Sequence, residues 1–183
     1  MAASSKRAFS IIEILVVIAI ISVLAAVLLP ILGRAKAKAY RVRCVSQLGQ
    51  IGQAFIGYAQ DHNERLPWQL TSDESREAFG ENKDDFVMDH AAMFSLPSIR
   101  HDLATAAILL SPCDPGRAPA NEEAQEQWSK IDPLQGRMLP ADAISYVLID
   151  GADIARSGTV LATTRNLSTC NLGTARWSGA DEP

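Results

Sequence analysis

One long apolar stretch constrains what this chain can fold into. Residues 14–33 carry no charged side chain, and the stretch is bounded by Glu13 and Arg34. A helix of about 20 apolar residues rises about 30 Å, which is the thickness of the hydrocarbon core of a bilayer. A cleaved secretory signal has a shorter apolar core, of about 7–15 residues, followed by a small-residue cleavage site. The stretch therefore predicts a retained, membrane-competent helix and not a discarded signal peptide.

Two residues in or beside this stretch are unusual for a plain anchor. A carboxylate such as Glu13 is costly in lipid, and it is by default a functional residue that needs a partner. The simpler alternative is a side chain that reaches the membrane interface. Pro30 removes one backbone hydrogen bond, so we expect a kink or a local loss of helix there. The simpler alternative for Pro30 is an ordinary transmembrane kink, which membrane helices tolerate.

The residues that precede the stretch carry a recognisable pattern. A basic pair at residues 6–7 precedes the small residue Ala8, and a Phe-x-x-x-Glu pattern from Phe9 to Glu13 then opens the apolar run. This segment resembles the class III signal of type IV pilins and type II secretion pseudopilins. Pro30 adds to the resemblance, because many members of that family carry a helix-breaking proline at the same spacing. The family strongly prefers glycine where this chain has Ala8, which is a departure from its pattern.

The resemblance implies a processing and assembly route. It implies that a prepilin peptidase cuts between Ala8 and Phe9 and N-methylates the new amino group of Phe9. It also implies that Glu13 neutralises the Phe9 amine of a neighbouring subunit during polymerisation. The implied partners are further copies of the chain, the peptidase, an assembly platform in the inner membrane, and membrane lipid. The implied location is the bacterial inner membrane, single-pass with the head in the periplasm, and later a pilus or pseudopilus filament.

Composition divides the chain into four segments. With 183 residues, it is long enough for one domain plus an appendage. We expect a basic leader at 1–8, an apolar transmembrane or filament-core helix at 9–33, an amphipathic continuation of that helix at 34–60, and a small globular head at 61–183. The expected fold class is α+β, with a long kinked N-terminal helix packed on a small antiparallel sheet.

The second half of the helix has a helical apolar period. Apolar residues recur every three or four positions after residue 33, which predicts one buried stripe. The stripe comprises Ala37, Tyr40, Cys44, Leu48, Ile51, Phe55 and Tyr58. Polar residues, among them Gln47, occupy the other faces, and the turn-forming cluster at 61–63 predicts the end of the helix.

Basic residues cluster just after the apolar stretch. They are Arg34, Lys36, Lys38, Arg41 and Arg43, with no acidic residue before Asp61. Pairing with acidic head residues of neighbouring subunits and contact with anionic lipid headgroups are both favoured over nucleic-acid binding, because the net charge of the chain is −4. More Lys and Arg follow the stretch than precede it, so the positive-inside rule favours a cytoplasmic C-terminus. The family resemblance implies the opposite topology, and we follow the resemblance.

The head shows weaker signals. The best strand is 144–149, and 159–164 is a second strand that we expect to pair with it in antiparallel fashion. Residues 172–177 could add a third strand. Residues 85–94 have a helix-like pattern stopped by Pro97, and 121–131 predicts a surface helix with Ala124, Trp128 and Ile131 facing inward. The chain ends in loop-like residues, whereas similar proteins often continue into a terminal strand, so we expect that the natural chain is longer.

The cysteines do not suggest a metal centre. The chain has three, Cys44, Cys113 and Cys170, with no CxxC motif and no nearby histidine, which makes a zinc site a poor interpretation. In an oxidising periplasm, one disulfide and one buried thiol are possible, and Cys113–Cys170 is the pair to test. Three buried thiols fit the sequence equally well.

The head carries no recognisable catalytic motif. None of the three histidines has a metal-ligand spacing, and the sequence contains no GxSxG, P-loop or GxGxxG. Asp150 and Asp153 share a loop and could bind calcium, although solvated turn carboxylates are the commoner case. We expect no enzymatic activity and no other cofactor. The alternative class is a single-pass envelope protein that anchors a binding or enzymatic head.

Overall fold

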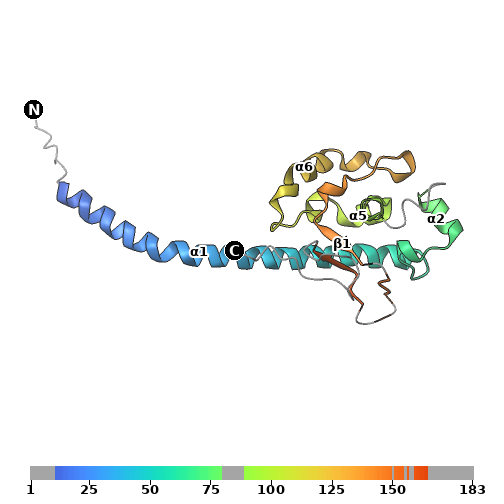
Figure 1. The fold of residues 1–183 in the computed structure, drawn as a ribbon, viewed down its shortest axis with the longest axis horizontal. Helices are drawn as coiled ribbons and strands as arrows, with labels where there is room; N and C mark the ends of the chain where they lie inside the picture. The colour runs from blue at the N-terminus through green and yellow to red at the C-terminus, as the bar shows by residue number, and fades with distance from the viewer. Residues whose placement is uncertain (1–10, 80–88, 150, 155, 157–158, 165–183) are drawn as a thin grey trace, which may run out of the picture. The chain divides into compact units, whose positions relative to one another are not determined.

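The computed structural model describes residues 11–79, 89–149, 151–154, 156 and 159–164. The chain forms two compact units, residues 1–41 and 42–183. The first unit consists, where it is described, of helix alone (Figure 1). The second unit contains the C-terminal part of that helix together with all the shorter elements.

Helix α1, Ile11–Asp61, is the main element of the fold. Its end confirms the prediction that the cluster at 61–63 terminates the helix. The helix is unbroken at Pro30, so the local loss of helix considered for that position does not occur. The predicted first residue, Phe9, lies outside the described residues. The described structure thus has the long N-terminal helix and the small antiparallel sheet of the predicted α+β fold.

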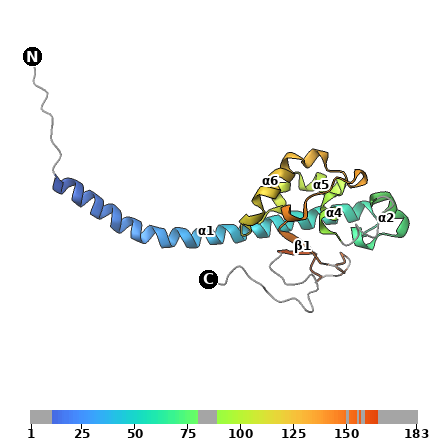
Figure 2. The same cartoon turned by 45° about the horizontal axis from the view of Figure 1, so that its top comes forward.

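The described part of the head is built from short helices and a small sheet. Its helical elements are η1 Pro67–Gln69, α2 Ser72–Phe79, α4 His90–Ser95, α5 Pro97–Leu103, η2 Ala106–Leu109, η3 Pro115–Arg117, α6 Ala118–Glu126, η4 Trp128–Lys130, η5 Pro133–Gln135 and η6 Ala141–Ala143. Figures 1 and 2 show α5 and α6 on one side of the C-terminal part of α1, and Figure 2 shows the sheet on the other side.

Local capping chemistry explains where the short helices begin and end. The Asp89 side chain accepts a hydrogen bond from the Ala91 amide, which caps α4. Pro97 was expected to stop a helix, and it also starts one: α4 ends at Ser95, and α5 begins at Pro97 because proline is tolerated in a first turn. The predicted helix at 121–131 is divided, with α6 ending at Glu126 and η4 following it.

The sheet matches the prediction in pairing and is shorter than predicted. Strands β1, Tyr146–Leu148, and β2, Ala162–Thr164, are antiparallel, and Val147 pairs with Thr163 at the centre. The Ile149 amide extends the pairing by donating to the Leu161 carbonyl at 2.9 Å. The third strand predicted at 172–177 lies outside the described residues.

The core of the head lies against one face of α1. Cys44, Ile51, Phe55 and Tyr58 are buried and Leu48 is partly buried, which confirms the predicted stripe from residue 44 onward. Aromatic packing is centred on Phe55, whose ring lies 5.6 Å from that of Phe94 in an edge-to-face arrangement and 6.0 Å from that of Trp68. Of the three inward residues predicted near α6, Ala124 and Ile131 are buried and Trp128 is half-buried.

Gln47 is the clearest error in the sequence interpretation of α1. It was placed on a polar face, yet it is buried within the head. Its amide Nε2 donates to the carbonyls of Ala107 at 3.1 Å and Leu110 at 3.0 Å, and its Oε1 accepts from the Tyr146 hydroxyl at 2.8 Å. Because each polar atom has a partner, hydrogen bonds within the protein offset the cost of removing the amide from water.

Candidate assembly helix

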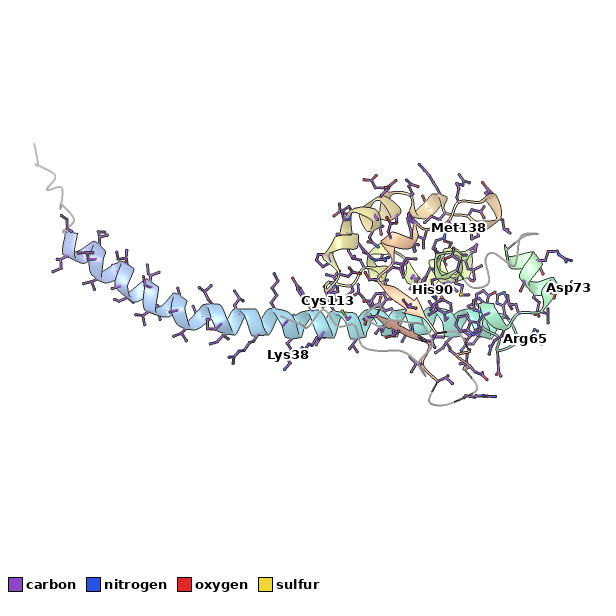
Figure 3. The ribbon with its side chains drawn as sticks, in the orientation of Figure 1. Lys38, Arg65, Asp73, His90, Cys113 and Met138 are labelled. Atoms are coloured by element: carbon purple, nitrogen blue, oxygen red, sulfur yellow. The ribbon has the colours of Figure 1, made fainter. Side chains whose placement is uncertain are left out.

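The N-terminal part of α1 exposes an apolar surface on all sides. Among the described residues, α1 is the one helix long and apolar enough to cross a membrane, and none of its most apolar window is buried. Its large side chains between residues 14 and 32 remain exposed, from 49% for Val17 to 68% for Leu29. Figure 3 shows these side chains projecting around the helix. Contiguous apolar surface beyond a few hundred Å² marks a membrane or protein interaction site.

Polar groups within the apolar segment are few and locally satisfied where the structure describes them. The Ser22 hydroxyl donates to the Ile18 carbonyl at 2.7 Å, one turn earlier in the same helix. Glu13 is exposed and lies in the first turn of α1, at the end where the helix dipole favours negative charge. Ala8 and Phe9, the predicted cleavage and methylation positions, lie outside the described residues.

A band of positive charge follows the apolar surface. All five of its basic side chains are exposed: Arg34, Lys36, Lys38, Arg41 and Arg43. The Lys36 ammonium lies 5.5 Å from the centre of the Tyr40 ring, within the range of a cation–π contact. The band begins where the uncharged stretch ends, so it could interact with lipid headgroups or with acidic groups on other subunits.

The described part of the head contains no group of three or more His, Cys, Asp or Glu side chains that could hold a metal ion. Of the two weak calcium candidates, Asp150 lies outside the described residues, and Asp153 lies 3.5 Å from the Arg156 guanidinium. The calcium site therefore stays a prediction, as do the absence of enzymatic activity and of other cofactors.

The histidines have separate structural surroundings. His62 stacks on the Tyr58 ring at 3.9 Å, and its Nδ1 lies 2.8 Å from the Tyr58 carbonyl oxygen, to which it donates. Burial lowers the pKa of His90 at the start of α4, while the carboxylate of Asp89 acts in the opposite direction. His101 is exposed. The structure does not bring the three together.

The cysteines differ from each other in exposure. Cys44 is buried, whereas Cys113 is exposed, so the alternative with three buried thiols is wrong. Cys170 lies outside the described residues, and the predicted Cys113–Cys170 disulfide is therefore untested.

The comparisons with known proteins bear on the N-terminal helix alone. Residues 3–29 match the family model described as the prokaryotic N-terminal methylation motif. No curated protein and no solved structure matches the chain significantly. The match covers the basic leader, the Phe-x-x-x-Glu pattern and most of the exposed apolar helix, which together indicate membrane anchoring. Residues 3–29 of this chain thus match the prepilin-type cleavage and methylation segment of type IV pilins and pseudopilins.

Proposed function

We propose that the chain is a structural subunit of a type IV pilus or a type II secretion pseudopilus. The observation that carries the proposal is an exposed, uncharged helix surface that begins directly after Glu13 and overlaps the methylation motif. Such a helix needs lipid before assembly and other apolar helices afterwards. The same surface would therefore hold the subunit in the inner membrane and later form the filament core.

Processing would prepare the helix for assembly. Prepilin peptidase would cut after Ala8 and methylate the new amino group of Phe9. The new terminus would then lie about one helical turn from Glu13, since Glu13 is four positions after Phe9 and a turn contains about 3.6 residues. Cleavage also removes the basic pair of the leader, so the processed helix could be withdrawn from the membrane without moving those charges through lipid.

Glu13 would set the register of the filament. A carboxylate among apolar helices is costly unless it is paired, and the Phe9 amine of a neighbouring subunit is the proposed partner. Subunits that dock one helical turn out of register would leave both charges uncompensated. The small residues Ala19, Ala25 and Ala26 would allow neighbouring helices to approach closely along the rest of the surface.

The basic band would support the interaction next to the filament core. We propose that it pairs with acidic head residues of neighbouring subunits, since the whole chain has a net charge of −4 in spite of this cluster. Before assembly, the same side chains would contact anionic lipid headgroups. Exposed ion pairs of this kind are each worth about 0–1 kcal/mol, so they would adjust packing while the apolar surface supplies most of the stability.

The intact mass of the protein extracted from membranes of its native host tests the proposal. We expect loss of residues 1–8 and the addition of one methyl group at Phe9. An Ala8→Gly variant is the matched control, because it restores the residue that the family prefers and should be processed at least as completely. An uncleaved wild-type chain would refute the proposal and favour a membrane-anchored protein with a binding or enzymatic head.

The location of the head needs a separate test, because the basic band favours a cytoplasmic C-terminus. We propose a periplasmic head. A reporter enzyme that is active only after export, fused after residue 183, should be active. If this fusion is inactive, and a second fusion at the same position to a reporter that works only in the cytoplasm is active, the periplasmic assignment is wrong.

A further inference from the structure

Two cysteines distant in sequence meet at one hydroxyl group in the head. The sulfur of Cys44, on α1, lies 3.2 Å from the Ser111 hydroxyl oxygen. The backbone amide of Cys113 donates to the same oxygen at 3.2 Å. The Cys44 sulfur and the Cys113 amide nitrogen therefore contact the same oxygen atom, that of the Ser111 hydroxyl. Figure 3 shows Cys113 beside α1, in agreement with these contacts.

The elements on either side hold this juxtaposition in place. The Gln47 amide, one turn beyond Cys44 on α1, donates to the carbonyls of Ala107 and Leu110, and so fixes the chain that leads into the turn at 111–116. The Tyr146 hydroxyl donates to Gln47 from β1 at 2.8 Å. The turn that carries Cys113 is thus tied to the same stretch of helix that carries Cys44.

The surroundings of Tyr146 give a second indication that both thiols are near one point. Burial is the main cause that raises the pKa of the Tyr146 phenol, and electrostatic interaction with Cys44 and with Cys113 raises it further. Both thiols thus act on the same phenol, which agrees with the contacts that Cys44 and Cys113 make with the Ser111 hydroxyl. Cys44 is buried and Cys113 is exposed, so a reagent from solvent would reach Cys113 first.

We propose that Cys44 and Cys113 form a disulfide that ties α1 to the turn at 111–116. A disulfide needs Cα atoms about 4.4–6.8 Å apart, and formation here requires the sulfur of Cys44 to leave the Ser111 hydroxyl and the side chain of Cys113 to rotate inward. The proposal rests on the proposed function in one respect: the periplasm supplies the oxidising compartment. The bond would close a loop from residue 44 to residue 113 and restrict the unfolded chain.

The chemistry is a thiol–disulfide exchange with an external disulfide as the oxidant. The Cys113 thiolate attacks one sulfur of the oxidant, forms a mixed disulfide and releases the first thiol of the oxidant. The Cys44 thiolate then attacks the Cys113 sulfur, forms the Cys44–Cys113 bond and releases the second thiol. Two protein thiols are oxidised, one external disulfide is reduced, and the two protons leave on the released thiols.

Peptide mapping tests the bond directly, because trypsin separates the three cysteines. They fall in the peptides 44–65, 101–117 and 166–176. The detergent-solubilised full-length protein is incubated with excess oxidised glutathione, alkylated, digested without reduction and analysed by mass spectrometry. We expect peptide 44–65 linked to peptide 101–117 in most molecules. A link between 101–117 and 166–176, three alkylated thiols, or a dimer bridged through Cys113 would each overturn the proposal.

Variants confirm the assignment without relying on a fragile core substitution. Cys170→Ser is the matched control and should leave the 44–65 to 101–117 link unchanged, whereas Cys113→Ser, at an exposed position, should abolish it. Because the experiment uses purified protein, it does not depend on cleavage or on membrane topology. If the link forms in the purified protein but both thiols are reduced in cells, the result would contradict the periplasmic location and would still support the disulfide.

Discussion

The hydrogen bond between Tyr146 and Gln47 gives the most specific test of how the head is held on α1. Tyr146→Phe removes the hydroxyl that donates to Gln47 Oε1 at 2.8 Å, and leaves that oxygen buried without its donor. A buried group that loses its partner costs about 1–3 kcal/mol. With about 2–4 °C per kcal/mol for a domain of this size, the midpoint of thermal unfolding should fall by about 2–12 °C.

A second tyrosine provides a matched control. Tyr58 is as deeply buried as Tyr146, but its hydroxyl has no hydrogen-bond partner among the described residues. Tyr58→Phe therefore removes an unsatisfied polar atom and keeps the ring, so stability should be unchanged or rise by up to about 1 kcal/mol. The same chemical change at two buried positions is thus expected to have opposite or clearly unequal effects.

Thermal unfolding of the detergent-solubilised protein, followed by tryptophan fluorescence, measures both variants, since Trp68 and Trp128 both lie in the head. A double-mutant cycle with Gln47→Ala isolates the interaction. The sum of the losses in free energy of unfolding in the two single variants should exceed the loss in the double variant by about 1 kcal/mol. The reason is that both single variants remove the same hydrogen bond. Equal midpoints for the two Tyr→Phe variants, or strict additivity in the cycle, would refute the reasoning.

Three further predictions follow from the sequence and the structure. Glu13→Ala should keep membrane insertion and abolish ordered filaments, and normal filaments in electron micrographs would remove the assembly role of that carboxylate. Gly49→Ala should raise the free energy of unfolding by about 1 kcal/mol, because a Cβ there meets open space. Gly57→Ala should raise it less, because its Cβ would lie 2.7 Å from the Asp102 carboxylate. Equal increases in the midpoint of thermal unfolding would contradict this order. Burial raises the pKa of Tyr146 above its ordinary value of 10.0, so its contribution to stability is complete below about pH 10 and is lost as the pH rises further; Tyr146→Phe should flatten this alkaline loss in unfolding midpoints measured against pH.

Local periodic signals predicted the parts of the fold that depend on nearby residues. The uncharged stretch, the cluster at 61–63 and the stripe from Cys44 to Tyr58 each depend on spacing within one helix, and the structure has α1 and its buried face accordingly. The strand pair was also predictable, because both segments are rich in β-branched residues and a segment with Gly, Asp and Ser lies between them in the sequence.

Interactions between distant residues could not be predicted in the same way. Gln47 is polar by sequence, and only the approach of two carbonyls and a hydroxyl from remote elements makes its burial favourable. Pro97 was interpreted as a stop because its role as the first residue of a new helix depends on the chain direction after Leu96. The meeting of Cys44 and Ser111 joins residues 67 positions apart, a separation for which sequence spacing gives no signal.

The position of the buried stripe near the start of the head has a consequence for the order of folding. The partners of this buried part of α1 are synthesised later: Ser111 follows Cys44, in the stripe, by 67 residues, and Tyr146 follows the buried Gln47 by 99. At about 5–20 residues per second, Tyr146 is synthesised on the order of 5–20 s after Gln47. Contacts of such high sequence separation also close slowly. The nascent subunit therefore carries two uncovered apolar surfaces for seconds. The N-terminal helix is long and apolar enough for a bilayer to cover it, whereas the stripe stays exposed to water, and to aggregation, until the rest of the head is made.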